Sequence, residues 1–137
     1  MQIIDVKEKW TNRINTVTIG ATKAEGGTRA KTVTVGGETT LPFLTFEGEI
    51  PNPPAIAGLV VDVVPEDWPD VLKQAIGKEI NSPVEWAQKA VRDWKVDLIC
   101  LKLLGPDPLG RNLSADHAAK TVKDVLNAVD VPLIIWG

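Results

Sequence analysis

The stretch Ala57-Gly-Leu-Val-Val-Asp-Val-Val64 is an almost uninterrupted apolar run, and Pro65 ends it. Such runs are typical of parallel strands, which are covered on both faces. Two similar runs follow, Val96-Asp-Leu-Ile-Cys-Leu-Lys-Leu-Leu104 and Val131-Pro-Leu-Ile-Ile-Trp136. They are spaced roughly 35 residues apart, which leaves room for a helix in each connection and therefore predicts parallel strands with right-handed crossovers.

The segments between the runs carry helix signals. Ser82, Pro83 and Glu85 form an N-cap, a first-turn proline and a capping-box partner, which together predict a helix from Pro83 to about Trp94. A shorter helix is predicted from Trp68 to Ile76. Ser114 is expected to cap a third helix, whose apolar face includes residues 118, 122, 125 and 129.

The N-terminal part of the chain has a different pattern. Asn15-Thr-Val-Thr-Ile-Gly20 and Lys31-Thr-Val-Thr-Val-Gly36 alternate threonine with valine or isoleucine, which predicts two strands of a hairpin with a long polar loop. Four prolines between residues 40 and 54 indicate an irregular connector. Its Phe43, Leu44 and Phe46 are expected to fix it to the domain surface. The sequence thus divides into residues 1–54 and the strand–helix region 55–137.

Composition excludes several classes of function. The 137 residues carry a formal net charge of -3 with no dense Lys/Arg cluster, so a nucleic-acid partner is not expected. No apolar segment resembles a membrane span or a secretory leader, so we expect a cytoplasmic location. Cys100 is the single cysteine, which is too few for an internal disulfide or the four thiolates of an iron–sulfur cluster.

The third apolar run reaches Trp136, one residue before the end of the sequence. Three parallel strands leave exposed edges, and a doubly wound sheet or a closed barrel needs more strands. We therefore expect the sequence to be the N-terminal fragment of a longer chain.

Three segments resemble a known family. They are TVTIGATKAEGGTR (16–29), the long phrase TVTVGGETTLPFLTFEGEIPNPP (32–54) and the later DLICLKLLGPDP (97–108). Together they are similar to the N-terminal part of the corrinoid iron–sulfur protein small subunit, whose archaeal counterpart is the delta subunit of the acetyl-CoA decarbonylase/synthase complex. The resemblance implies an α/β fold, a parallel (β/α)8 TIM barrel of which this sequence supplies an N-terminal hairpin and about three strands.

The same resemblance implies a function. Members of this family help to hold cobalamin that carries a methyl group from methyltetrahydrofolate to acetyl-CoA synthase in the reductive acetyl-CoA (Wood-Ljungdahl) pathway. The implied partners are a large corrinoid subunit that bears the iron–sulfur cluster and shares the cobalamin, a methyltetrahydrofolate methyltransferase, acetyl-CoA synthase and a reductive activator. The chain itself would be a carrier subunit without catalytic residues. The alternative is an enzyme, a pterin-binding methyltransferase barrel, because the two families share an architecture.

Two charged residues interrupt neighbouring apolar runs. Asp62 and Lys102 each stand near the carboxyl end of a predicted strand, where a parallel barrel has its functional mouth. A buried charge needs a partner or water. The two residues are therefore expected to form a structural ion pair or a solvated rim, or to contact the corrin ring and its amide side chains.

Three further residues are candidates for the same mouth. Asp107 and Asn112 belong to the loop after the second run, where their role is loop geometry or contact with cofactor or partner. Trp136 ends the third run and either packs in the core or offers a flat face to the corrin. His117, the single histidine, lies in a predicted first helical turn and lacks the surroundings of a cobalamin ligand, so no metal ligand is assigned.

Overall fold

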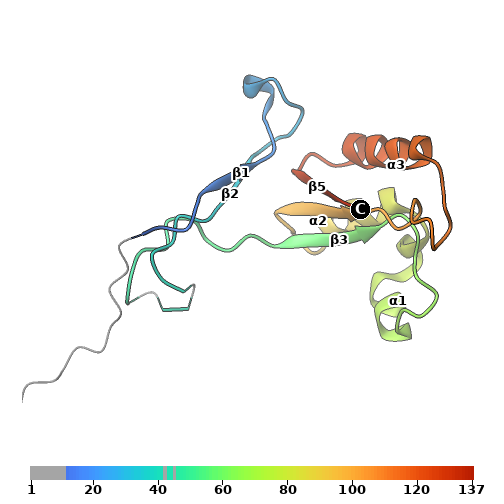
Figure 1. The fold of residues 1–137 in the computed structure, drawn as a ribbon, viewed down its shortest axis with the longest axis horizontal. Coiled ribbons are helices and arrows are strands. Elements are labelled where there is room, and N and C mark those ends of the chain that lie inside the picture. Colours follow the sequence, from blue (N-terminus) through green and yellow to red (C-terminus); the bar gives the residue numbers. More distant parts are fainter. Residues whose placement is uncertain (1–11, 42, 45) are drawn as a thin grey trace, which may run out of the picture. The chain divides into compact units, whose positions relative to one another are not determined.

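The computed structural model describes residues 12–41, 43, 44 and 46–137 of the chain (Figure 1). Its regular elements are, in order, β1 (Val17–Ile19), β2 (Val33–Val35), β3 (Ala57–Val61), α1 (Asp70–Ile76), α2 (Pro83–Arg92), β4 (Leu98–Lys102), α3 (Ala115–Ala128) and β5 (Leu133–Trp136), with short 3-10 turns η1 (Lys23–Glu25) and η2 (Gly77–Asn81). The order of elements predicted from the sequence is confirmed, and the observed strands and helices are shorter than the predicted segments at one or both ends.

The chain divides into two compact units, which are described separately. Of the described residues, the first unit contains 12–18 and Thr34–Pro54. The second contains Ile19–Val33, the tip of the hairpin, together with Ala55–Gly137. β1 and β2 form a two-stranded antiparallel sheet, as the alternating Thr/Val pattern predicts.

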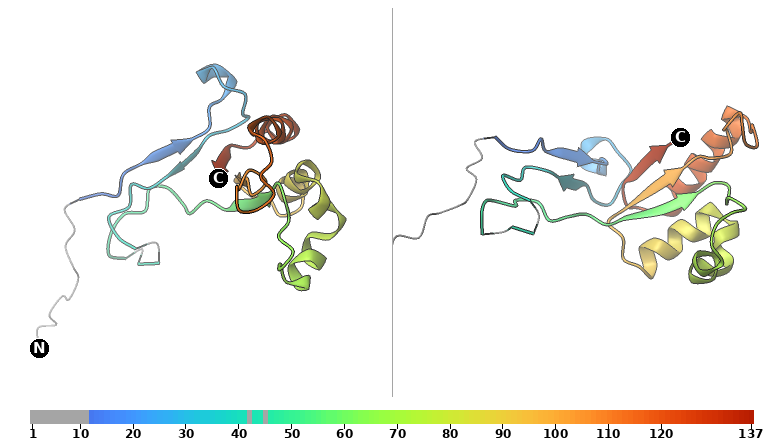
Figure 2. Two further views of the ribbon diagram at one scale, coloured as in Figure 1. Left: turned by 45° about the vertical axis from the view of Figure 1, so that its right-hand side comes forward. Right: turned by 60° about the horizontal axis from the view of Figure 1, so that its bottom comes forward.

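The second unit is built on a parallel sheet of three strands in the order β3–β4–β5. Side chains alternate between the faces of a strand. On one face, Val60, Ile99 and Leu101 are fully buried and belong to one core cluster with Trp86 of α2 and Val125 of α3. On the opposite face Leu59 is 40% exposed. Helices therefore cover one face of the sheet, as Figure 2 also shows.

The predicted (β/α)8 barrel is wrong for this structure. The fold is a small α/β arrangement with an open three-stranded parallel sheet and a separate two-stranded sheet. The barrel was implied by the family resemblance, whereas the spacing of the apolar runs predicted only parallel connections. Those connections form here, but three strands with outer edges at β3 and β5 do not close on themselves.

The helix caps predicted from the sequence are confirmed. The backbone N–H of Glu85 donates to Ser82 Oγ (3.3 Å) at the start of α2, and that of His117 donates to Ser114 Oγ (3.2 Å) at the start of α3. Each serine satisfies an N–H group that the first helical turn leaves without a partner. None of the described helices has the length and hydropathy of a bilayer-spanning segment.

Candidate functional site at the carboxyl ends of the parallel strands

Lys102 and Trp136 meet at the carboxyl ends of β4 and β5. They are direct partners in the strand register, and Val61 of β3 continues the same row. Partners in one row project from the same face of the sheet. The Lys102 ammonium lies 4.1 Å from the centroid of the Trp136 ring, a cation–π contact. Trp136 is still 52% exposed, so much of its indole remains available.

Asp62 has a different role from the one expected. Its Oδ1 accepts hydrogen bonds from the backbone N–H groups of Leu104 (2.6 Å) and Gly105 (3.1 Å), and its Oδ2 accepts from Gly105 (3.0 Å). A Cβ at position 105 would stand 2.7 Å from Asp62 Oδ2, so glycine allows this close approach. The carboxylate thereby fixes the start of the loop that follows β4.

The predicted ion pair between Asp62 and Lys102 is wrong. Among the described residues the ion pairs do not include these two side chains, although the Asp62 N–H donates to the Lys102 carbonyl (3.1 Å). The cause is the register. Lys102 is the partner of Val61, so Asp62 is one residue further along and alternates to the other face of the sheet.

Asp107 organises the loop between β4 and α3. Its Oδ1 accepts from the N–H of Leu109 (2.9 Å), and its carbonyl accepts from Gly110 and Asn112 (both 3.0 Å). The Leu113 N–H closes the loop on the Gly105 carbonyl (2.8 Å). This pattern is an Asx turn inside a hydrogen-bonded loop. The oxygens of Asp107 are therefore engaged by backbone N–H groups of the loop itself.

An open cavity of about 490 Å³ lies beside this loop. Its lining is formed by Lys102, Leu103, Leu104, Pro106, Asp107, Pro108 and Gly137. Two of the five predicted site residues, Lys102 and Asp107, line it directly, and Trp136 lies beside Lys102. Asn112 is exposed with a positive φ of 49°, a conformation that asparagine tolerates well, and it shapes the loop from outside the lining.

Neither a catalytic group nor a metal ligand was assigned from the sequence. His117 lies exposed in the first turn of α3, where the sequence placed it. Within residues 12–41, 43, 44 and 46–137, no three His, Cys, Asp or Glu side chains are grouped so that they could hold a metal ion. The strand-end site can therefore offer a flat aromatic ring, an ammonium donor and a shaped loop.

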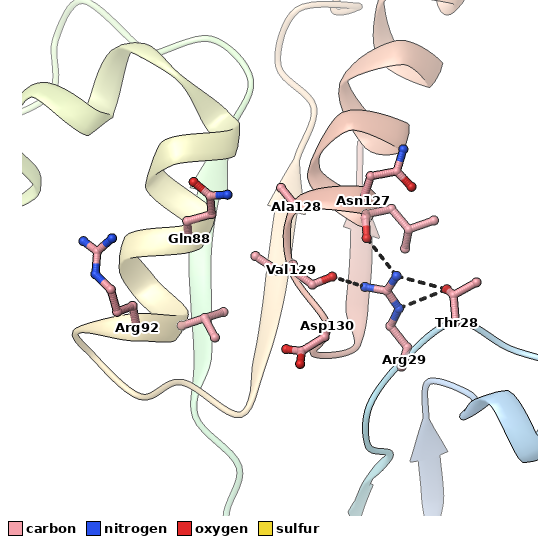
Figure 3. A pocket seen from close by; sticks show the side chains of 10 residues that line it. Thr28, Arg29, Gln88, Arg92, Asn127, Ala128, Val129 and Asp130 are labelled. Atoms are coloured by element: carbon pink, nitrogen blue, oxygen red, sulfur yellow. Dashed lines mark hydrogen bonds between the residues drawn. The ribbon is translucent and has the colours of Figure 1, made fainter.

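Arg29, by contrast, is a residue whose importance the sequence did not reveal. It belongs to the hairpin loop that the sequence predicts to be long and polar, but it is only 8% exposed. Its guanidinium donates to the carbonyls of Leu126 (2.7 Å), Val129 (2.6 Å) and Val131 (3.3 Å), around the end of α3. Figure 3 shows the bond to Val129. The Thr28 hydroxyl accepts two further bonds. No motif in the loop distinguishes this arginine from its charged neighbours.

Arg29 also lines a second open cavity of about 780 Å³ between the carboxyl-terminal ends of α2 and α3. Apart from Thr28, its other polar side chains belong to Gln88, Arg92, Asn127 and Asp130, shown in Figure 3. All four are exposed, and Arg92 is paired with the adjacent Asp93 (2.7 Å). The guanidinium of Arg29 is already occupied by carbonyls. We therefore regard this cavity as the surface around a structural arginine.

The carboxylate of Asp97 connects two segments at the amino-terminal end of the parallel sheet. Asp97, just before β4, accepts a hydrogen bond from the N–H of Ile56 (2.9 Å) and lies 3.5 Å from the Lys31 ammonium. The backbone hydrogen bond from Ile56 holds the pKa of Asp97 below its usual range, and Lys31 adds to this effect. The candidate ligand-binding residues thus lie at the carboxyl-terminal ends of the parallel strands, and the structural carboxylate of Asp97 lies at their amino-terminal ends.

Comparison with known proteins places the chain among related sequences. Residues 16–137 match the family model described as CO dehydrogenase/acetyl-CoA synthase delta subunit. The chain is 42% identical to the acetyl-CoA decarbonylase/synthase complex subunit delta of Archaeoglobus fulgidus over 96% of its own length, and 42% identical to subunit delta 1 of Methanosarcina thermophila over 94%. The subunit delta of Methanocaldococcus jannaschii is 36% identical over 95%. The matches span 29%, 29% and 31% of those relatives.

Proposed function

Because the chain belongs to the CO dehydrogenase/acetyl-CoA synthase delta subunit family, we propose that it acts in a methyl-carrying corrinoid iron–sulfur protein. In this proposal it is the smaller subunit and helps to hold a cobalamin at the carboxyl ends of β3, β4 and β5. The large subunit contributes the rest of the cofactor site and the iron–sulfur cluster. The methyl group comes from methyltetrahydrofolate through a separate methyltransferase and passes to acetyl-CoA synthase, with a reductive activator restoring oxidised cobalt.

The observation that carries the proposal is the half-exposed Trp136 ring with Lys102 beside it at the sheet edge. A corrin is a broad ring fringed with carboxamide groups. An indole can pack against such a surface, and an ammonium has three N–H donors for carboxamide oxygens. Ligands of parallel α/β sheets bind at the carboxyl ends of the strands, where these two residues lie.

The residues at the strand ends are suited to contact the edge of a corrin ring rather than to ligate its cobalt. At the described strand ends the polar groups are Asp62, Lys102 and Asp107, and the two carboxylates are engaged by backbone N–H groups of the loop. Lys102 is the polar side chain there that can turn from Trp136 to a ligand. When bound, the cofactor supplies a cobalt-centred methyl carrier. The work of this chain is to position the ring edge and to shield it from water.

The proposal predicts that cobalamin binding is shared between chains. The protein alone should bind hydroxocobalamin weakly, because the one aromatic ring and one ammonium at the described strand ends contact little of the ligand. Adding the purified large subunit should produce tight binding, measured by equilibrium dialysis or by the visible absorption of the corrin. Submicromolar binding by the full-length protein alone, or no tight binding by the mixture, would contradict the proposal.

A further inference from the structure

One continuous segment after β4 forms nearly all of the lining of the strand-end cavity. The residues that line this cavity all belong to residues 102–108, except Gly137. Gly105 is the one member of that segment that does not line it. We call residues 102–108 the wall segment. Because it makes up the lining, its position determines the shape of the cavity.

The wall segment is hydrogen-bonded to the ends of both neighbouring strands. On the β3 side, the carboxylate of Asp62 accepts from the N–H groups of Leu104 and Gly105. On the β5 side, the Leu103 N–H donates to the carbonyl of Trp136 (2.7 Å). Three consecutive backbone N–H groups are therefore held by two different strands. Removing the Asp62 carboxylate would release the β3 side and leave the bond to β5 in place.

Gly105 allows the Asp62 carboxylate to reach the wall segment. A Cβ at position 105 would stand 2.7 Å from Asp62 Oδ2 and 2.9 Å from Leu113 Cδ1. The end of a leucine side chain can shift, but the carboxylate cannot move away without losing its hydrogen bonds. The φ angle of Gly105 is not positive, so alanine at this position would be opposed by the contact with Asp62 and not by its backbone conformation.

Asp62 itself does not line the cavity, and both of its oxygens accept from the wall segment. We propose that Asp62 is a positioning residue for the cofactor, which holds the wall segment in the shape that receives the edge of the corrin ring. This inference rests on the proposed function. A wall that is already in place does not have to be ordered when the ligand binds, so its hydrogen bonds to Asp62 increase affinity without any contact between Asp62 and the ligand.

The first test is equilibrium dialysis of hydroxocobalamin against the complex of the full-length protein with the large subunit. Asp62→Ala should raise the dissociation constant about fivefold and leave the number of binding sites unchanged, because the wall segment would then have to be ordered on binding. Asp124→Ala is the control, because Asp124 pairs with Lys120 on the surface of α3, and it should leave the dissociation constant unchanged.

The two measured quantities separate positioning from stability. If Asp62 only stabilises the fold, Asp62→Ala reduces the number of binding sites through unfolding and leaves the dissociation constant at the wild-type value. That result would overturn the inference. A wild-type complex that does not bind hydroxocobalamin would refute the proposed function, and this inference with it.

The conservative variant Asp62→Asn tests the acceptor role. Oδ1 of Asp62 accepts from both Leu104 and Gly105, and the amide oxygen of asparagine can replace it there. The amide NH2 would take the place of Oδ2 and face the Gly105 N–H, so the rescue should be partial. Asp62→Asn should therefore bind hydroxocobalamin more tightly than Asp62→Ala. Equal affinity of the two variants would overturn the inference.

A double variant tests whether Asp62 acts through Gly105. Gly105→Ala should also raise the dissociation constant, because its methyl group would displace the carboxylate. Without the carboxylate the methyl group has room, so Asp62→Ala with Gly105→Ala should bind no more weakly than Asp62→Ala alone. Residues in contact give such non-additive effects, whereas independent residues give additive ones. Additive losses of affinity would overturn the inference.

Discussion

Replacing Arg29 by alanine should lower the free energy of unfolding by about 3 kcal/mol. The guanidinium is the donor for three backbone carbonyls around the end of α3, those of Leu126, Val129 and Val131. Removing it would leave these partly buried acceptors without their hydrogen bonds and would detach the hairpin tip from α3 and β5. Chemical denaturation of the full-length protein measures the effect.

The matched control for this substitution is Arg92→Ala. Arg92 is exposed and paired with its neighbour Asp93, and exposed pairs contribute about 1 kcal/mol or less. Arg29→Lys should fall between the two, because one ammonium cannot reach three carbonyls in the arrangement that a planar guanidinium allows. If Arg29→Ala and Arg92→Ala lower the free energy of unfolding equally, Arg29 does not hold residues 19–33 to the end of α3.

Replacing Asp62 by alanine should lower the free energy of unfolding by about 2 kcal/mol. The carboxylate accepts from the N–H groups of Leu104 and Gly105, and these donors would lose their partner. Because the loop between β4 and α3 starts there, we also expect the amide hydrogens of these two residues to exchange faster. Hydrogen-exchange mass spectrometry of the full-length protein measures both effects.

Asp124→Ala is the control for the Asp62 substitution. Asp124 pairs with Lys120 one turn earlier on the surface of α3, so its loss should cost less than about 0.5 kcal/mol and leave the exchange of the loop unchanged. Unchanged protection of Leu104 and Gly105 in Asp62→Ala would show that the carboxylate does not fix this loop.

The elements of the second unit could be predicted because their signals are local. Continuous apolar runs indicated β3, β4 and β5. Ser82 with Pro83 and Glu85 indicated the start of α2, and Ser114 indicated the start of α3. The barrel, which the resemblance implied and the structure contradicts, has no such local signal. Closure depends on the number of strands and their shear, and neither is a property of one strand–helix repeat.

The candidate site was predicted in its location and only partly in its contacts. The sequence placed Asp62 and Lys102 on adjacent strand ends, which is correct. Whether they meet depends on a register offset of one residue, and no local pattern determines that offset. The same register brings Lys102 to Trp136. Arg29 was missed because its partners are backbone carbonyls about 100 residues away, which leave no trace in the sequence around it.

The most direct test of the account is the affinity of the reassembled complex for hydroxocobalamin when Trp136 is replaced by alanine. The loss of one stacking surface should raise the dissociation constant about tenfold, equivalent to roughly 1.4 kcal/mol. Trp94→Ala is the control, because Trp94 is similarly exposed (42%) but lies beyond the end of α2, and it should leave the affinity unchanged. A Trp136→Ala complex that binds cobalamin as tightly as the Trp94→Ala complex would contradict a cofactor site at the strand ends.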